Sequence, residues 1–472
     1  MTFSKVEDPD GVGTITFDRF NGTLDLSSID VGQPFALFLG AIAIAGTGNS
    51  PEFPGEAIAS YRDPLSFDGG ITIETEGLTP LNISAAPVPR DQSHAIVTQG
   101  DGKMVSAGSA FDATNNDDFA VARYNADGSL DTTFDGDGKL TTDFAGGSDV
   151  ALAAALQADG KLLVAGEAGN GNDSDIAVAR YNSDGSLDAS FGSAGKVRLD
   201  LTGADEVAQS IAVQADGKIV VAGYIGNDTG RDFLVVRLNG DGSIDDDAFG
   251  TQGFARLDFA GGADYVTALT LQSDGKIVLA GTANLGDAAT KTDFALARYN
   301  SDGTIDGSFG AAGQATTDLG GSTDFVEALA VQSGDGKLIV AGHTSKDADA
   351  NFVVARYSKD GTLDADFANG GTLIEDFGGS NDYAYAVTPQ SDGKILLAGY
   401  TQSASEDFAV LRLNANGAVD TTFGVDGKVA IDFSGGDDFA ESMTPQADGK
   451  ILVAGWAATA TGDDFAVARL NP

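Results

Sequence analysis

Short apolar runs separated by Gly- and Asp-rich turns repeat along most of the chain. One unit contains four such runs, at 150–157, 161–166, 175–181 and 196–201. Asp-Gly and Gly-rich sequences of the kind that form tight turns separate them, and no window carries the apolar period of a helix over three turns. The pattern predicts four antiparallel strands in each unit.

The triplet Asp-Gly-Lys marks seven copies of this unit. The copies begin at Asp101, Asp159, Asp216, Asp274, Asp335, Asp392 and Asp448, which gives steps of 56 to 61 residues. Each unit of a repeat protein buries its core against its neighbours. Four strands per unit and short connections predict an all-β fold, a seven-bladed β-propeller with four-stranded antiparallel blades. An open solenoid is the alternative, and we expect a ring because the seventh unit stops after its third run.

The repeats divide the chain into three parts. Residues 93–472 form the predicted propeller, 63–92 a linker with a ring-closing strand, and 1–62 a small N-terminal β segment that could be a tether, a partial sandwich or an assembly element. Phe67–Ile73 is similar to the fourth run of the units, as in Phe423–Val429. We therefore expect residues 67–73 to supply the outer strand of the last blade.

The repeat motif resembles a known family. It reads Gln-Ala-Asp-Gly-Lys-Ile-Leu-Val-Ala-Gly at 446–455 and Asp-Ile-Ala-Val-Ala-Arg-Tyr-Asn-Ser-Asp-Gly-Ser-Leu-Asp at 175–188. This resembles the bacterial delta-60 repeat, a β-propeller family, which implies the fold and an extracellular bacterial setting but no catalytic residues. Phe17–Leu24 also resembles the choice-of-anchor modules of bacterial surface proteins.

The charge narrows the choice of partners. The chain has 70 acidic and 27 basic residues, a net charge of −43, and no Cys. Such a surplus of carboxylates argues against nucleic acid and anionic membranes as partners, and disulfides and Cys-bound zinc are excluded. No run reaches the length of a membrane-spanning helix, and the apolar stretch 35–45 lacks the basic leader of a signal peptide. An extracellular or cell-surface location fits these features.

The recurring Asn-x-Asp-Gly-Ser-x-Asp sequence is the candidate metal site. Alternating oxygen-bearing side chains around a Gly are typical of calcium loops. The candidate ligands are Asn125, Asp127, Asp131, Asn182, Asp184, Asp188, Asn239, Asp241, Asp245, Asn300, Asp302 and Asp306. The alternative is a turn in which Asx side chains accept hydrogen bonds from the backbone. Calcium is the only cofactor that the sequence suggests.

One Arg per unit, at the end of the third run, recurs together with an Asp in the fourth run. Repetition in nearly every unit indicates a structural role, because a functional site usually breaks the symmetry of a repeat. We expect ion pairs Arg123–Asp143, Arg180–Asp200, Arg237–Asp258, Arg298–Asp318, Arg356–Asp376 and Arg412–Asp432.

The predicted function is that of a non-enzymatic structural or interaction module. His94 and His343 are not in equivalent positions and form no catalytic motif, and the inner runs are mostly apolar. Loops between the second and third runs vary most, and Trp456 at the start of the last one is a candidate contact for a protein or a surface polysaccharide. Two alternatives stay open: self-assembly into a filament through the N-terminal segment, and a polysaccharide hydrolase or lyase with axial carboxylates.

Overall fold

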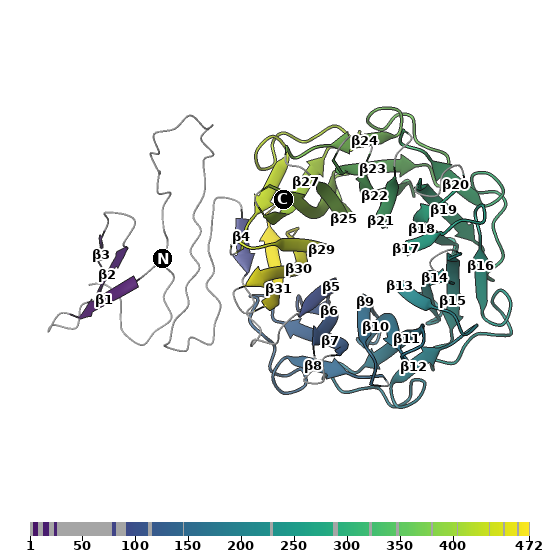
Figure 1. The fold of residues 1–472 in the computed structure, drawn as a ribbon, viewed down its shortest axis with the longest axis horizontal. Helices are drawn as coiled ribbons and strands as arrows, with labels where there is room; N and C mark the ends of the chain where they lie inside the picture. The colour runs from purple at the N-terminus through teal and green to yellow at the C-terminus, as the bar shows by residue number, and fades with distance from the viewer. Residues whose placement is uncertain are drawn as a thin grey trace.

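Seven four-stranded antiparallel sheets surround a central axis in the computed structural model (Figure 1). The structure describes residues 91–471, except 112–115, 145, 227–229, 287–290, 321–322, 346–348, 379–380, 404, 434, 447–448 and 460–461, together with four N-terminal strands. Three of these, β1 (Phe3–Glu7), β2 (Gly13–Phe17) and β3 (Thr23–Asp25), form a small sheet of their own. The predicted seven-bladed propeller with a small N-terminal β segment is confirmed.

Each blade runs from an inner strand at the axis to an outer strand at the rim. The inner strands are β5 (Gln92–Thr98), β9 (Asp149–Leu156), β13 (Glu206–Val213), β17 (Tyr265–Leu271), β21 (Asp324–Val331), β25 (Asp382–Pro389) and β29 (Asp438–Pro445). The second strands are β6 (Met104–Phe111), β10 (Leu162–Gly169), β14 (Ile219–Ile225), β18 (Ile277–Ala283), β22 (Leu338–Thr344), β26 (Ile395–Gln402) and β30 (Ile451–Thr459).

The third strands are β7 (Asp117–Tyr124), β11 (Ser174–Tyr181), β15 (Asp232–Leu238), β19 (Asp293–Tyr299), β23 (Asn351–Tyr357), β27 (Glu406–Leu413) and β31 (Gly462–Leu470). The outer strands of blades 1 to 6 are β8 (Lys139–Thr142), β12 (Lys196–Leu199), β16 (Phe254–Leu257), β20 (Gln314–Thr317), β24 (Thr372–Glu375) and β28 (Lys428–Ile431).

The outer strand of blade 7 comes from the N-terminal part of the chain. Strand β4 (Leu78–Leu81) pairs antiparallel with β31, with Leu78 opposite Leu470 and Leu81 opposite Val467. The ring is thus closed by a strand from the predicted linker, but this strand is 78–81 and not 67–73, which lies outside the described residues. The spacing explains the difference. The outer strand of each other blade precedes the Asp-Gly-Lys triplet of the next unit by a nearly constant distance. Strand β4 lies close to that distance before Asp101, whereas residue 67 lies farther from it.

The hydrophobic core lies between blades. Each of seven buried clusters draws side chains from two neighbouring blades, as Leu163 and Ile176 of blade 2 pack with Val221 and Leu234 of blade 3. The cluster between blades 7 and 1 joins Leu452 and Val467 to residues of the first described blade, so the same packing closes the ring. One flat blade cannot bury both of its faces alone, and the ring provides a partner for each face.

Candidate functional site

The repeated Arg pairs with a different Asp from the one predicted. In blade 2, Nε of Arg180 donates to Oδ2 of Asp188 at 2.8 Å, and both side chains are buried. The observed pairs are Arg123–Asp131, Arg180–Asp188, Arg237–Asp245, Arg298–Asp306, Arg356–Asp364 and Arg412–Asp420. The predicted pairing of these Arg side chains is therefore wrong for all six partners, which were Asp143, Asp200, Asp258, Asp318, Asp376 and Asp432.

Antiparallel pairing explains the correction. Ala179 lies opposite Lys196 and Ile176 opposite Leu199, so the end of β12 lies beside the start of β11. Asp200 therefore approaches Asp175, at the opposite end of the strand from Arg180. The carboxylate that reaches Arg180 follows the next turn, eight residues along the chain.

The proposed calcium loops are hydrogen-bonded turns. Oδ1 of Asp184 accepts hydrogen bonds from the backbone N–H of Ser186 at 3.0 Å and from its hydroxyl at 2.6 Å, while Nδ2 of Asn182 donates to the Ser186 hydroxyl. Asp188, the last member of the set, holds Arg180 and also Nζ of Lys161, 2.8 Å away. These contacts keep the pKa of the Asp188 carboxyl well below its usual range. The three side chains are not brought together as ligands, and the structure instead matches the Asx turn.

The same arrangement holds in the other three predicted loops. Asn125, Asp127 and Asp131 of blade 1 have the same partners at equivalent positions, and so do the loops at 239–245 and 300–306. Carboxylates gather elsewhere, at the junctions between blades. The groups are Asp118–Asp143–Asp149, Asp175–Asp200–Glu206, Asp232–Asp258–Asp264, Asp293–Asp318–Asp324 and Asp407–Asp432–Asp438.

One residue of every inner strand bulges out of the sheet pairing. In blade 3, Ala208 pairs with Gly223 and Ser210 with Ala222, so that Gln209 has no partner in β14. A β-bulge re-aims the side chain of its extra residue. The seven bulge residues are His94, Leu152, Gln209, Thr267, Glu327, Tyr385 and Glu441.

A glycine opposite each bulge makes this geometry possible. A Cβ on Gly223 would lie 1.8 Å from the carbonyl oxygen of Val207. The equivalent glycine of every other blade meets its inner strand at a similar distance. The glycine at this point of each second strand is therefore required by the close approach of two backbones.

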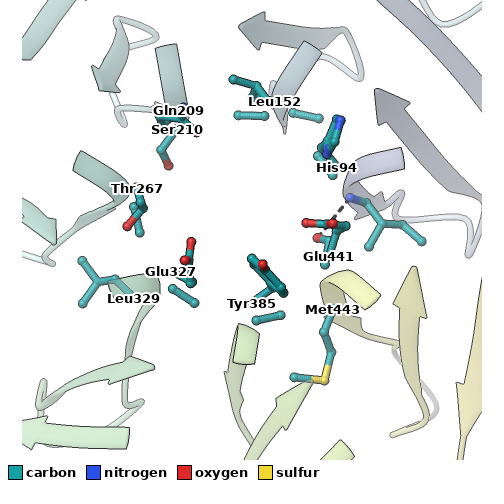
Figure 2. Close-up of a pocket in the computed structure, with 18 of the residues that line it drawn as sticks. His94, Leu152, Gln209, Ser210, Thr267, Glu327, Leu329, Tyr385, Glu441 and Met443 are labelled. Carbon is teal, nitrogen blue, oxygen red and sulfur yellow. Dashed lines mark hydrogen bonds between the residues drawn. The ribbon is translucent and has the colours of Figure 1, made fainter. Parts of the chain in front are cut away.

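The bulge residues line a cavity on the propeller axis. The cavity has a volume of about 250 Å³, and Figure 2 shows His94, Gln209, Thr267, Glu327 and Glu441 arranged around it. The seven positions are equivalent in the fold, yet they hold six residue types with different chemistry. Symmetry is thus broken at the axis, where the sequence predicted mostly apolar side chains.

Two carboxyl groups in the cavity hold their protons more strongly than usual. Burial, with a contribution from Glu441, raises the pKa of Glu327 to about 8. Burial also raises the pKa of Glu441 to about 7, opposed by a hydrogen bond from Trp456. Burial lowers the pKa of His94 to about 4, so its ring is neutral at pH 7. At pH 7, Glu327 therefore offers mainly a protonated carboxyl group, whereas Glu441 is divided between its protonated and ionised forms.

Blades 5, 6 and 7 place six rings beside this cavity. At one cross-strand position the three blades carry two rings each, as Phe325–His343, Tyr383–Tyr400 and Phe439–Trp456. Blades 1 and 2 have no ring there, and blades 3 and 4 have one each, as Gln92–Ser109, Val150–Glu167, Val207–Tyr224 and Tyr265–Thr282. The rings within these pairs stack with centroids 4.9, 4.8 and 4.2 Å apart. Neighbouring pairs are also in contact, because the ring centroids of His343 and Tyr383 lie 4.5 Å apart, as do those of Tyr400 and Phe439. We call these six residues the aromatic arc.

The aromatic arc contacts the cavity in each of its three blades. Nδ1 of His343 lies 3.7 Å from Oε1 of Glu327, and the ring of Tyr400 lies 5.9 Å from that of Tyr385. Trp456 donates to Glu441. Apart from the buried His343, the arc residues are partly exposed. The cavity and the arc thus form one site on the side of the axis made by blades 5 to 7.

The sequence predicted this site only in part. Trp456 was expected to be an exposed contact, and it is part of the arc, while His94 and His343 contribute to the cavity and the arc. The other rings were not predicted as site residues, because they occupy repeat positions. Their signal is the residue directly after each Ala-Gly, which is Ser109, Glu167, Tyr224, Thr282, His343, Tyr400 and Trp456 in the seven blades.

Within the part of the chain that the structure describes, no helix is long and apolar enough to cross a membrane. No curated protein matches the chain. Solved structures match the chain at low identity.

A protein of unknown function from Dyadobacter fermentans is 14% identical, with a TM-score of 0.46 over 82% of this chain and 97% of its own. The polysaccharide lyase Uly1 is 12% identical, with a TM-score of 0.47 over 83% and 92%. Chaetomium thermophilum Sqt1, solved with the N-terminus of ribosomal protein L10, is 12% identical, with a TM-score of 0.42 over 77% and 82%.

A family model matches the chain once in every blade. Its description is "Domain of unknown function (DUF5122) beta-propeller", and it covers residues 99–134, 157–191, 214–247, 272–309, 334–367, 390–423 and 446–472. The delta-60 and choice-of-anchor resemblances go beyond this match and stay predictions. The repeats that build the blades are thus the repeats of this model, and the chain belongs to the DUF5122 β-propeller family.

Proposed function

We propose that this protein is a non-enzymatic binding module that holds a neutral polysaccharide on the aromatic arc and in the axial cavity. The observation that carries the proposal is the concentration of six rings at one repeat position of blades 5 to 7, beside Glu327 and Glu441. An extracellular or cell-surface location in a bacterium belongs to the same proposal. The surplus of carboxylates and the absence of Cys support that location.

The chemistry of the site favours a sugar over other ligands. The partly exposed rings offer large rigid apolar surfaces, against which the C–H face of a pyranose ring can pack. The carboxyl groups of Glu327 and Glu441 and the hydroxyl of Tyr385 lie beside these rings, where they can hydrogen-bond to sugar hydroxyls. Small-molecule sites are typically concave and mostly apolar, with a small number of polar groups that point toward the ligand.

The charge of the protein limits which polymers fit. A net charge of −43 repels uronate and sulfated polymers. We therefore expect neutral glycans to bind and acidic ones to be rejected.

Affinity electrophoresis against a panel of polysaccharides tests the proposal. The panel contains a mannan, a xylan, a β-glucan and, as the acidic member, an alginate. We expect retardation by at least one neutral polymer and by no alginate. The variant Trp456→Ala is expected to bind at least about tenfold more weakly, the effect of losing a central aromatic contact.

The matched control is Tyr224→Ala, because Tyr224 belongs to an aromatic pair with Tyr265 in blades 3 and 4, outside the arc. We expect it to bind like the original protein. Equal loss in both variants, or no retardation by any neutral polymer, contradicts the proposal.

Cleavage of the bound polymer is the second candidate, since two carboxyl groups with raised pKa values in one cavity are also suited to acid–base chemistry. Reducing-end and unsaturated-product assays on the retarded polymer distinguish the two. Bound polymer without new ends supports the binding module. New ends that disappear in Glu441→Gln support the enzyme. Self-assembly through the N-terminal segment stays a prediction, and sizing at high concentration tests it.

A further inference from the structure

The junction between blades 6 and 7 holds a compact group of carboxylates. Asp407 lies in β27, Asp432 directly follows β28, and Asp438 is the first residue of β29 in the next blade. Phe408 pairs with Ile431, so the strand pairing places Asp407 and Asp432 at the same end of blade 6. One carboxylate oxygen from each of the three residues lies within 4.8 Å of the others. We call these three residues the junction cluster.

Asp438 is the buried member of the junction cluster and is incompletely bonded. Its side chain is fully buried, with an exposed fraction of 0%. Oδ2 accepts a hydrogen bond from the N–H of Phe433 at 2.7 Å, whereas Oδ1 has no hydrogen-bond partner among the described residues. A buried oxygen that has lost water and gained no donor costs free energy, so its position calls for a further ligand.

The charges that act on Asp438 are of one sign. Asp407 and Asp432 belong to the junction cluster with Asp438. Glu406 and Asp437 directly precede two of its members in the sequence. Like charges at these distances are stable together only when a proton or a cation neutralises them.

Three other blade junctions place a basic side chain beside their carboxylates. Arg198 pairs with Asp175 at 2.5 Å, Arg256 pairs with Asp232, and Lys291 lies 3.1 Å from Asp318. At the position of Arg198 and Arg256, blade 6 has Ala430. The junction cluster thus has its acids in the common arrangement and a small apolar residue in place of those bases.

We propose that the junction cluster binds a divalent cation of the calcium class through Asp407, Asp432 and Asp438. Calcium takes oxygen ligands in a flexible geometry, which suits three carboxylates from two blades, with water or backbone carbonyls completing the shell. Magnesium demands a stricter octahedron and keeps more of its water, so calcium is the better fit. The bound ion joins blade 6 to blade 7 beside Phe439 of the aromatic arc.

Calorimetric titration of the full chain with CaCl₂, after removal of metals by a chelating resin, tests this proposal. The variants are Asp438→Asn and Asp407→Asn, and the control is Asp184→Asn, an exposed residue of a loop that the sequence alone assigned to calcium. We expect the original protein and the control to bind equally. Each cluster variant should lose one site, or bind at it at least about tenfold more weakly, because the site loses a charged ligand.

Thermal unfolding provides the second readout. Calcium is expected to raise the midpoint of the original protein more than an equal concentration of magnesium, because the ion binds only the folded state. The rise should shrink in both cluster variants and persist in the control. Asp407→Asn serves if Asp438→Asn fails to fold, since Asp407 is not fully buried. Absence of calcium binding by the original protein, or cluster variants that bind as many calcium ions as the original protein with the same affinity, overturns the proposal.

Discussion

Nη1 of Arg469 donates to the carbonyl oxygen of Ala126 at 3.0 Å, across the junction where blade 7 meets blade 1. The equivalent Arg356 donates to Ala415 of the next blade at 2.6 Å, and other members of the series do the same. The ring is therefore closed by the same contact that joins its successive blades. In blades 1 to 5, each such Arg is a link between blades as well as the partner of an Asp.

Removing one of these links should destabilise the protein strongly. Arg180→Met removes the guanidinium partner of the buried Asp188, which keeps Lys161 and Ser190, and also removes the bond to blade 3. We expect a loss of about 3–5 kcal/mol in the free energy of unfolding, as for other broken buried ion pairs. Urea unfolding measures it, and Asp184→Asn, at the exposed turn, should leave the unfolding midpoint nearly unchanged. A small effect of Arg180→Met would show that the pair contributes little.

The glycine opposite each bulge should be irreplaceable. Gly223→Ala places a Cβ 1.8 Å from the Val207 carbonyl oxygen, which only a shift of the inner strand can relieve. We expect a loss of at least about 3 kcal/mol, or failure to fold. Gly307→Ala is the control, because nothing lies within 4 Å of its added Cβ. Thermal unfolding of both variants decides, and equal midpoints would contradict the argument.

Stability should fall as pH rises from about 5 to 8. The pKa of Glu327 is 4.5 in its ordinary state and about 8 when folded, and that of Glu441 rises to about 7. In this window the folded chain binds protons that the unfolded chain has released, so raising the pH favours unfolding. The Asp188 carboxyl, with its lowered pKa, contributes its stabilisation throughout this window and loses it only in stronger acid.

The double variant Glu327→Gln, Glu441→Gln isolates this effect. It should flatten the change in the free energy of unfolding between pH 5 and 8 by at least about 1.4 kcal/mol, the value of one pKa unit. Unfolding by urea at each pH, with metals chelated, provides the measurement. If the free energy of unfolding depends on pH in the same way in the double variant and the original protein, the titrating groups lie elsewhere in the protein.

Strand β4 should be required for a stable ring. A chain beginning at residue 91 lacks β4, so β31 keeps an unpaired edge with Val467 and Ala468. We expect a lower midpoint of thermal unfolding and association through this edge. A chain beginning at residue 63 keeps β4 and is the matched control. Identical midpoints of the two truncated chains would exclude a role for the closing strand.

The sequence predicted the fold better than the site, for identifiable reasons. Asp-Gly-Lys recurs at nearly even spacing, which specifies seven units, and the four apolar runs in each unit specify four short strands. The ion pairs were assigned wrongly because two Asp residues follow Arg180 at constant offsets, Asp188 and Asp200. Choosing between them requires knowing which ends of β11 and β12 meet.

The axial cavity shows the same limit. Glu327 and Tyr385 are unremarkable members of apolar runs until a bulge turns them toward the axis. The bulge depends on a backbone contact with the glycine of the second strand, so the sequence of the inner run alone does not predict the bulge. Similarly, the junction cluster becomes visible only when Asp438 of one blade meets Asp407 of the preceding one.

The bulge separates the part of each repeat that must stay constant from the part that is free to change. Its glycine is required by the close approach of two backbones, whereas the bulge side chain lines the axial cavity and is half-buried in every blade. A mutation at one of these seven positions therefore changes the lining of the cavity without altering any strand pairing. Duplicated repeats can thus diverge in what they bind while the ring that carries them stays the same.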